Sequence, residues 1–366
     1  MSLKRTPLYE EHMKLGARIV DFGGWEMPVQ YKGVIEEHIT CRKSLGIFDA
    51  SHMGEFVVTG KDTLAFLNTL VTNNVSTMTD GQAQYTAMCN EHGGIIDDLI
   101  TYRFGPEHYF VVVNASNTEK DFAQFLEVAK SFQVRCENHG DRYALIALQG
   151  RNAEKCLATL TTVDLTSMKY YRFATASILG APVIIARTGY TGEDGFEVFC
   201  PPDKARSIWS ALLEKGTAYS IAPCGLAARD TLRTEMKFAL YGNELSEKTN
   251  PLEAGLGWVV KFDKGRFVGS DAIAKIREMG PARKLVGLEL LDRGIARHDY
   301  KIFSADEKTE IGTVTSGTHA PSLKKSIAIG YVRSADAAIG TEVRIDIRGQ
   351  KTLAKVVKTP FYTRDY

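Results

Sequence analysis

The chain has 366 residues, of which 44% are hydrophobic and 24% charged, and 45 basic against 44 acidic side chains leave a net charge of +1. This composition excludes a disordered chain, and at roughly 150 residues per domain the length predicts two to three domains. The balanced charge argues against a nucleic-acid partner, because such proteins present a basic face. No apolar run approaches the roughly 20 residues that span a bilayer, and the first residues lack the apolar core of a signal peptide. We therefore expect no membrane segment and a cytoplasmic location.

The first strong pattern along the chain is an internal repeat. Residues 55–70 and 145–160 each contain a β-type run, a glycine and a helical pattern that closes on Leu-x-Thr-Leu. Further along each copy, the strand patterns 110–113 and 196–199 precede apolar residues at helical spacing, and an earlier strand completes a hairpin. Each half thus follows the order strand, helix, hairpin, helix. This order predicts an α+β fold with helices on one face of a mainly antiparallel sheet.

Two adjacent carboxylates follow a glycine pair in the segment Gly93–Asp98. Adjacent side chains on a strand point to opposite faces, so Asp97 and Asp98 are not expected to share a metal, and one of them should face the covered side of the sheet. On residue type alone, the pair fits strand-end residues that make local hydrogen bonds. It also fits a single, partly buried carboxylate that acts as a hydrogen-bond acceptor or general base.

The second copy also carries polar residues that break its pattern. Three glycines in the loop Gly189–Gly195 indicate close backbone approach, and Glu197 stands where the first copy has Val111. Glu197 fits either an exposed edge strand or a ligand site. Arg229 and Arg233, four residues apart on one helix face, fit either surface ion pairs or the binding of an anionic or planar ligand. A site between the halves would suit a planar heterocycle, because a carboxylate accepts two parallel hydrogen bonds.

The pattern of hydrophobic residues changes after Met279–Arg283, which is the candidate linker. Short alternating runs between residues 286 and 357 predict a small all-β barrel or sandwich. We therefore divide the chain into residues 1–280 and 281–366. The six Cys and eight His are scattered without paired ligand spacing, so no metal site is expected.

The motifs in this order resemble the aminomethyltransferase, or T-protein, family of the glycine cleavage system. The matching stretches are Thr6–Glu10, Phe22–Trp25, Gly46–Met53, Gly93–Asp98, Gly189–Glu197, Cys224–Arg233, Asn250–Trp258 and Thr315–Thr318. The resemblance implies two pseudo-duplicated α+β halves that form a folate-binding domain, followed by a C-terminal all-β barrel domain. It also implies that the one-carbon unit of S-aminomethyl-dihydrolipoyl H-protein passes to tetrahydrofolate in glycine catabolism. The products are then 5,10-methylenetetrahydrofolate, ammonia and dihydrolipoyl H-protein.

The resemblance also assigns roles to individual residues. Asp97 is expected to be the catalytic carboxylate, which orients the attacking amine, accepts its proton and stabilises iminium-like charge as the C–S bond breaks. Glu197 is expected to bind the pterin ring. The other positions expected in the folate pocket are Met53, Tyr85, Val111, Tyr190, Arg229 and Trp258. Arg297 is expected near the entrance for the lipoyl arm, whereas Trp258, judged by residue type alone, would lie in the core.

Two other functions stay open at this stage. One is a related folate-dependent demethylase, and the other is a non-catalytic folate-binding protein, for example one that assists iron–sulfur assembly. Asp97 and the glycine-rich loop argue against the second. The folate half of an FAD-dependent sarcosine or dimethylglycine oxidase is disfavoured, because the chain has neither the length nor the fingerprint of an FAD domain.

Overall fold

Two sheets with the same strand order form the larger part of the computed structural model, which describes residues 2–366. The first sheet contains, in spatial order, β6 (Gln82–Cys89), β7 (Ile95–Gly105), β8 (His108–Val113), β5 (Gly54–Thr59) and β9 (Arg135–Asn138). The second contains β11 (Phe173–Ile178), β12 (Ala181–Ala186), β13 (Gly195–Cys200), β10 (Ala144–Gln149), β4 (Gly46–Asp49) and β14 (Ala222–Pro223). The antiparallel run β6-β7-β8-β5 thus corresponds strand by strand to β11-β12-β13-β10. The predicted duplication is confirmed, but each half has three antiparallel strands between its two helices where a hairpin was predicted.

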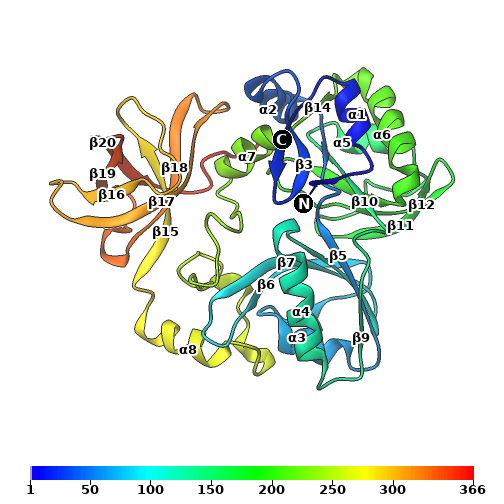
Figure 1. The fold of residues 1–366 in the computed structure, drawn as a ribbon, viewed down its shortest axis with the longest axis horizontal. Helices are drawn as coiled ribbons and strands as arrows, with labels where there is room; N and C mark the ends of the chain where they lie inside the picture. The colour runs from blue at the N-terminus through cyan, green and yellow to red at the C-terminus, as the bar shows by residue number, and fades with distance from the viewer. Residues whose placement is uncertain (1) are drawn as a thin grey trace.

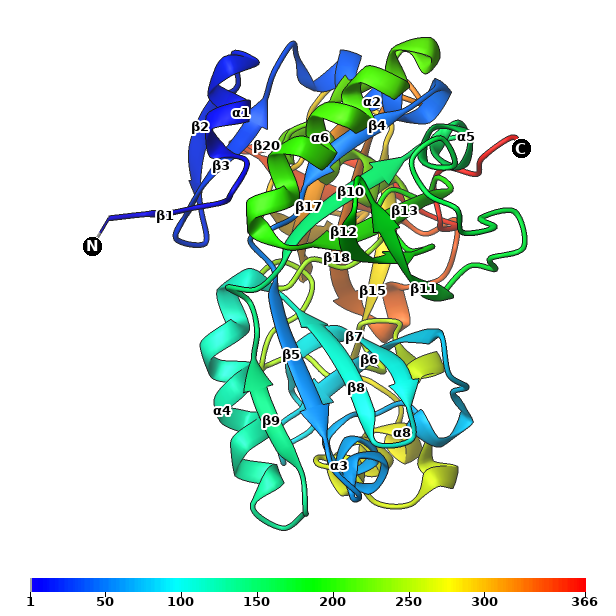
Figure 2. The same cartoon turned by 90° about the vertical axis from the view of Figure 1, so that its right-hand side faces the viewer.

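Helices cover one face of each sheet, and the other two faces pack against each other (Figures 1 and 2). The first sheet carries α3 (Thr63–Leu70) and α4 (Thr118–Ala129), and the second carries α5 (Ala153–Leu157) and α6 (Pro202–Gly216). Strand alternation produces this arrangement. In β8, Val111 and Val113 pack under the helices, whereas Phe110 and Val112 pack toward the second sheet. In the described part of the chain, no helix is both long and apolar enough to cross a membrane.

A small N-terminal sheet lies beside the second half and was not among the predicted elements. It contains β1 (Lys4–Arg5), β3 (Trp25–Gln30) and β2 (Arg18–Phe22), with the helices α1 (Tyr9–Lys14) and α2 (Val34–Lys43) following β1 and β3. Asp49 at the end of β4 fastens this region to the second half. Its carboxylate accepts hydrogen bonds from Thr6 at 2.6 Å and contacts a ring nitrogen of His12 at 2.8 Å.

The C-terminal part closes into a barrel (Figure 1). Around the barrel the strands are β15 (Arg283–Leu290), β18 (Lys325–Arg333), β17 (Glu310–Ala320), β16 (Lys301–Ser304), β19 (Glu342–Ile347) and β20 (Gln350–Val357). The last helix before them, α8 (Ser270–Met279), ends at Met279, the first residue of the predicted linker. Of the two predicted β architectures, the closed barrel is therefore the one that forms.

The helix α7 (Leu226–Glu235) lies between the barrel and the second half (Figure 1). Its Arg233 side chain pairs with Glu244 at 2.8 Å and donates to the Ser316 hydroxyl on β17 at 2.7 Å. Glu244 also accepts hydrogen bonds from Thr315 and Ser316, each at 2.6 Å. This buried charge pair with its added hydrogen bonds docks the barrel onto α7.

Candidate active site

A cavity of about 470 Å³ is lined by residues from both halves and from the segment that leads to the barrel. This volume is within the range usual for small-molecule sites. Six of the seven residues expected to bind folate line the cavity: Met53, Tyr85, Tyr190, Glu197, Arg229 and Trp258. Within residues 2–366, no group of three or more His, Cys, Asp or Glu side chains is placed to hold a metal ion.

The adjacent carboxylates of β7 point to opposite faces of their sheet. Asp98 lines the cavity, where its carboxylate accepts hydrogen bonds from the Tyr85 hydroxyl and the Asn114 side-chain amide, each at 2.9 Å. Asp97 is fully buried and accepts from the backbone N–H of Asn114 at 3.0 Å and the side chain of Asn117 at 2.6 Å. The expected place of Asp97 at the ligand is therefore wrong by one residue, since Asp98 is the carboxylate that the strand turns toward the cavity.

The prediction that Val111 lines the pocket is also off by one residue. Its side chain is buried with Phe56, Phe66 and Phe125 in the core beneath α3 and α4, and Val112 lines the cavity instead. Strand periodicity is the physical reason, because neighbouring side chains alternate between the two faces. The expected strand was correct, but the residue that faces the ligand side was not.

The surroundings of Asp98 raise its pKa above that of an ordinary aspartate. Burial and the neighbouring charge of Asp97 raise the pKa of Asp98 to about 7, although the hydrogen bonds from Tyr85 and Asn114 act in the opposite direction. Burial and the neighbouring Asp97 carboxylate also raise the pKa of Asp121, to about 11. A carboxyl group that titrates near neutral pH suits general acid–base chemistry.

Glu197 and Arg229 form a second charged region of the cavity. Glu197 is on β13, which lies between β12 and β10, so the exposed edge-strand interpretation is wrong. Burial raises the pKa of Glu197, while the hydrogen bond from Thr188 and the charge of Arg229 lower it. The Arg229 guanidinium lies 5.1 Å from the centre of the Tyr190 ring, within the range of a cation–π contact.

The two arginines of α7 have different surroundings. Arg233 pairs with Asp230 at 2.7 Å, as expected of an ion-pairing residue, but it is buried rather than on the surface. Arg229 lines the cavity and, within the described chain, forms no ion pair with Asp230 or Glu235. The ion-pair interpretation therefore fits Arg233, and the ligand-binding interpretation fits Arg229.

Aromatic rings form much of the remaining wall. Trp258 stacks on Tyr85 with ring centres 5.7 Å apart and planes 21° apart, and its exposed fraction of 59% shows that it is not a core residue. Tyr190 stacks on Phe238 at 5.8 Å. Stacked rings of this kind suit a planar heterocycle. Sequence reasoning missed the lining residues Asp98, Tyr102, Val112, Tyr170, Tyr171, Lys237 and Phe238.

Arg297 is not among the cavity-lining residues. It is exposed on the barrel side and donates to the Gly317 carbonyl at 3.2 Å. Its expected role near the entrance for the lipoyl arm stays a prediction.

Close packing explains why a glycine is needed at Gly94, in the turn before β7. A Cβ on Gly94 would lie 1.9 Å from the backbone oxygen of Glu247, so the turn that leads to Asp98 accepts no side chain there. We expect Gly94→Ala to lower the free energy of unfolding by about 1–3 kcal/mol, measured by urea denaturation. Gly105→Ala is the matched control on β7, because nothing lies within 4 Å of its added Cβ. Equal losses in the two variants would contradict this explanation.

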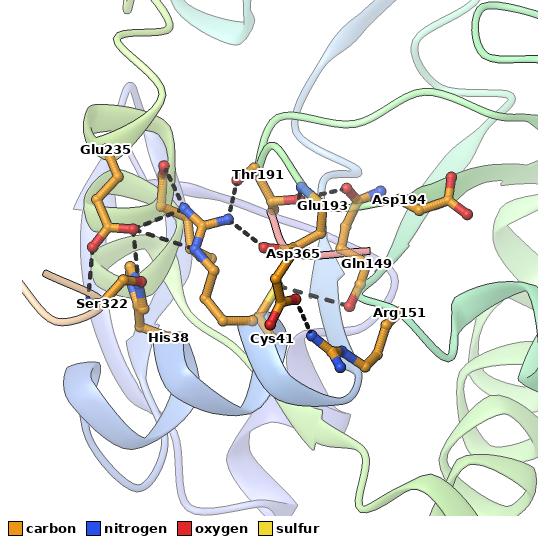
Figure 3. A network of polar contacts seen from close by, with 12 residues as sticks. His38, Cys41, Gln149, Arg151, Thr191, Glu193, Asp194, Glu235, Ser322 and Asp365 are labelled. Carbon is orange, nitrogen blue, oxygen red and sulfur yellow. Dashed lines mark hydrogen bonds and ion pairs between the residues drawn. The ribbon is translucent and has the colours of Figure 1, made fainter. Parts of the chain in front are cut away.

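A buried ionic network lies beside the glycine-rich loop of the cavity (Figure 3). Arg42 of α2 donates to the Thr191 carbonyl at 2.6 Å, to Glu193 at 2.8 Å and to Glu235 at 3.0 Å. His38 lies one helical turn earlier, 3.3 Å from Glu235. The network therefore holds the cavity loop through Thr191 against α2 and α7.

The chain after the barrel returns to the same network. Tyr362 lies over the Arg42 guanidinium at 3.9 Å, and the Tyr366 hydroxyl donates to Glu193 at 2.6 Å. From the barrel itself, the backbone N–H of Ser322 donates to Glu235 at 3.0 Å. The barrel and residues 361–366 thus share the charged groups that hold the cavity loop.

Comparisons with known proteins agree along the whole chain. The GCVT N-terminal domain model matches residues 8–264, and the glycine cleavage T-protein C-terminal barrel domain model matches residues 283–363. The chain is 50% identical over 362 residues to an aminomethyltransferase of Desulfitobacterium hafniense, covering 99% of each. It is 48% identical over 363 residues to one of Lysinibacillus sphaericus, covering 99% of this chain and 98% of the relative. The crystal structure of the glycine cleavage system aminomethyltransferase T from Bartonella henselae superposes with a TM-score of 0.93 and 36% identity, covering 100% of this chain and 99% of that one.

Proposed function

The chain belongs to the glycine cleavage T-protein family of aminomethyltransferases, and on this premise we propose that it transfers the one-carbon unit of an S-aminomethyl group on lipoylated H-protein to tetrahydrofolate. One C–S bond and one C–N bond of the aminomethyl group break, and two C–N bonds to the folate nitrogens form. The two protons leaving those nitrogens balance the departing dihydrolipoyl thiol and ammonia. The product is 5,10-methylenetetrahydrofolate.

The observation that carries this proposal is the Asp98 carboxyl group, which lines the cavity with a pKa near neutral. We assign to Asp98 the role first expected of Asp97. Its carboxylate orients an attacking amine, accepts the proton and stabilises positive charge that develops as the C–S bond breaks. Tyr85 and Asn114 fix its orientation through their hydrogen bonds.

The donors and acceptors of the cavity fit a folate. Thr188 donates to one oxygen of Glu197 and, among residues 2–366, no group donates to the other. That carboxylate can therefore accept the paired N–H groups of a pterin ring. Burial raises the pKa of Glu197, and the Thr188 hydrogen bond and the Arg229 charge oppose that rise. The aromatic walls contact the flat faces of the ligand.

Glu197→Gln is expected to weaken tetrahydrofolate binding about 10–100-fold, because a charged acceptor of hydrogen bonds becomes a neutral amide. Isothermal titration of the purified variant measures this change. Glu214→Gln is the control, since Glu214 is an exposed residue of α6 that does not line the cavity. An affinity change of the same size in the control, or none in Glu197→Gln, would argue against a pterin at this carboxylate.

The direct test combines the purified protein with tetrahydrofolate and aminomethylated H-protein. Release of ammonia together with formation of 5,10-methylenetetrahydrofolate is expected. Absence of both, with H-protein that is active with another T-protein, would refute the proposal. The demethylase and non-catalytic alternatives find no support among the relatives compared, which are named as aminomethyltransferases.

Three further expectations accompany this function. We propose that residues 1–280 form the folate-binding domain and residues 281–366 the barrel domain, because β15 begins at Arg283 and the boundary lies between the two family models, which match residues 8–264 and 283–363. Lipoylated H-protein is the proposed protein partner. A cytoplasmic location stays a prediction.

A further inference from the structure

We propose that Lys237 binds a carboxylate of the glutamyl tail of the folate and so selects for glutamylated forms of it. This assignment rests on the proposed function, because it concerns the same cavity. Lys237 lines that cavity, and neither the sequence patterns nor the family resemblance gave it a role.

The backbone at Lys237 has an unusual conformation for a lysine. Its φ of 56° is in the left-handed region, directly after α7. The backbone N–H of Phe238 donates to the Arg233 carbonyl at 2.9 Å, and that of Lys237 to the Thr234 carbonyl at 3.0 Å. This is the pattern of a Schellman helix end, where glycine is the usual residue. A residue that departs from such a local preference marks a candidate functional position.

The side chain of Lys237 reaches Gly255, another residue of the cavity lining, and has no polar partner there. Its Nζ lies 3.5 Å from the position that a Cβ on Gly255 would occupy, so it lies against the segment that also presents Trp258. Within the described chain, Nζ takes part in no hydrogen bond and no ion pair. Of the nearby carboxylates, Glu244 favours its charged form, but both oxygens of Glu244 already accept hydrogen bonds.

An unpartnered ammonium group in a cavity calls for an anion. Burial lowers the pKa of Lys237, and an anion bound beside it would stabilise the charged form again. The two carboxylates of the cavity have other donors, Tyr85 and Asn114 for Asp98 and Thr188 for Glu197. They suit the N–H groups of the ring system. Of the two cations in the cavity lining, Arg229 lies over the Tyr190 ring and acts on Glu197, which leaves Lys237 for the acidic end of the same ligand. Each added glutamate brings another carboxylate to this end.

The test compares tetrahydrofolate with tetrahydropteroate, which has the same ring system but no glutamate. Dissociation constants are measured by titration for the wild type, Lys237→Met and Lys237→Arg. We expect the wild type to bind tetrahydrofolate about tenfold more tightly than tetrahydropteroate. Lys237→Met should lose that factor while its affinity for tetrahydropteroate stays unchanged. Lys237→Arg, which keeps the charge, should retain most of it.

Three outcomes would overturn the assignment. Lys237→Met that keeps the wild-type preference shows that the ammonium group does not contact the tail. Equal weakening of both ligands shows a general effect on the cavity. A wild type that binds both ligands without preference overturns the role of Lys237 alone, whereas a wild type that binds neither refutes the proposed function as well.

Discussion

Replacing Asp98 with asparagine is expected to lower turnover by about 10²–10⁴-fold, the usual loss when a general acid–base group is removed. The amide has the same shape and can keep the hydrogen bond from Tyr85, so the affinity for tetrahydrofolate should change only a few-fold. Turnover is measured from 5,10-methylenetetrahydrofolate formation with saturating H-protein, and affinity by titration. A variant that loses folate binding but keeps its turnover at saturation would contradict a catalytic role.

Asp97→Asn is the matched control for this experiment. It changes the neighbouring residue in the same way but on the face of β7 that does not line the cavity. Turnover should stay within about tenfold of the wild type. Because the charge of Asp97 raises the pKa of Asp98, its removal should lower that pKa.

The pH profile adds a test that a structural defect would not reproduce. If the ionised form of Asp98 acts, wild-type activity rises as the pH passes about 7, the pKa of that carboxyl group. In Asp97→Asn the rise should move to lower pH. A larger loss of turnover in Asp97→Asn than in Asp98→Asn would return the catalytic role to Asp97, where the family resemblance first placed it.

The second large effect is expected at Arg42. Arg42→Met leaves the carboxylates of Glu193 and Glu235 buried without their shared cation, and removing one partner of a buried ion pair typically costs about 3–5 kcal/mol. Denaturant unfolding measures the loss. Arg151→Met is the control, because its pair with Asp365 is largely exposed and such pairs contribute about 0–1 kcal/mol. A loss below about 1 kcal/mol in Arg42→Met would mean that the network contributes no net stability.

The acid dependence of stability follows from the same network. Burial raises the pKa of Glu235, but the contacts with His38 and Arg42 bring it below its ordinary value. The stabilisation that Glu235 provides is therefore complete above the pKa of an unfolded glutamate, about 4.3, and is lost as the pH falls through the lower folded value. In Arg42→Met this loss should begin at a higher pH, since one of the three groups that lower the pKa of Glu235 is gone.

Local periodicity explains why the architecture could be predicted. The repeat over 55–70 and 145–160 and the alternating runs of the barrel depend on spacings of two and about 3.6 residues, which the sequence displays directly. The expectation at Asp97 comes from the family resemblance and not from this periodicity. Alternation along β7 indicates only that Asp97 and Asp98 face opposite sides, and the packing of the two sheets decides which side faces the cavity.

The contacts that could not be predicted join residues far apart in the chain. Arg42 and Glu193 are separated by 151 positions, and no local pattern marks either of them as a partner of the other. Lys237 follows a helix that the sequence indicated, but its left-handed backbone and its place in the cavity depend on how α7 meets the barrel. These features are properties of the assembled fold.

The return of residues 361–366 to the Arg42 network limits how substrates can reach the cavity. A barrel joined to the halves only through the linker near residue 281 could swing open like a hinged lid. Here Tyr362 and Tyr366 hold it at a second point. A rotation of the barrel away from the halves would break the contacts of Tyr362 with Arg42 and of Tyr366 with Glu193. Ligands therefore have to reach the cavity while the barrel stays docked on the two halves. A long, thin prosthetic arm matches such a route better than a substrate that needs the domains to separate.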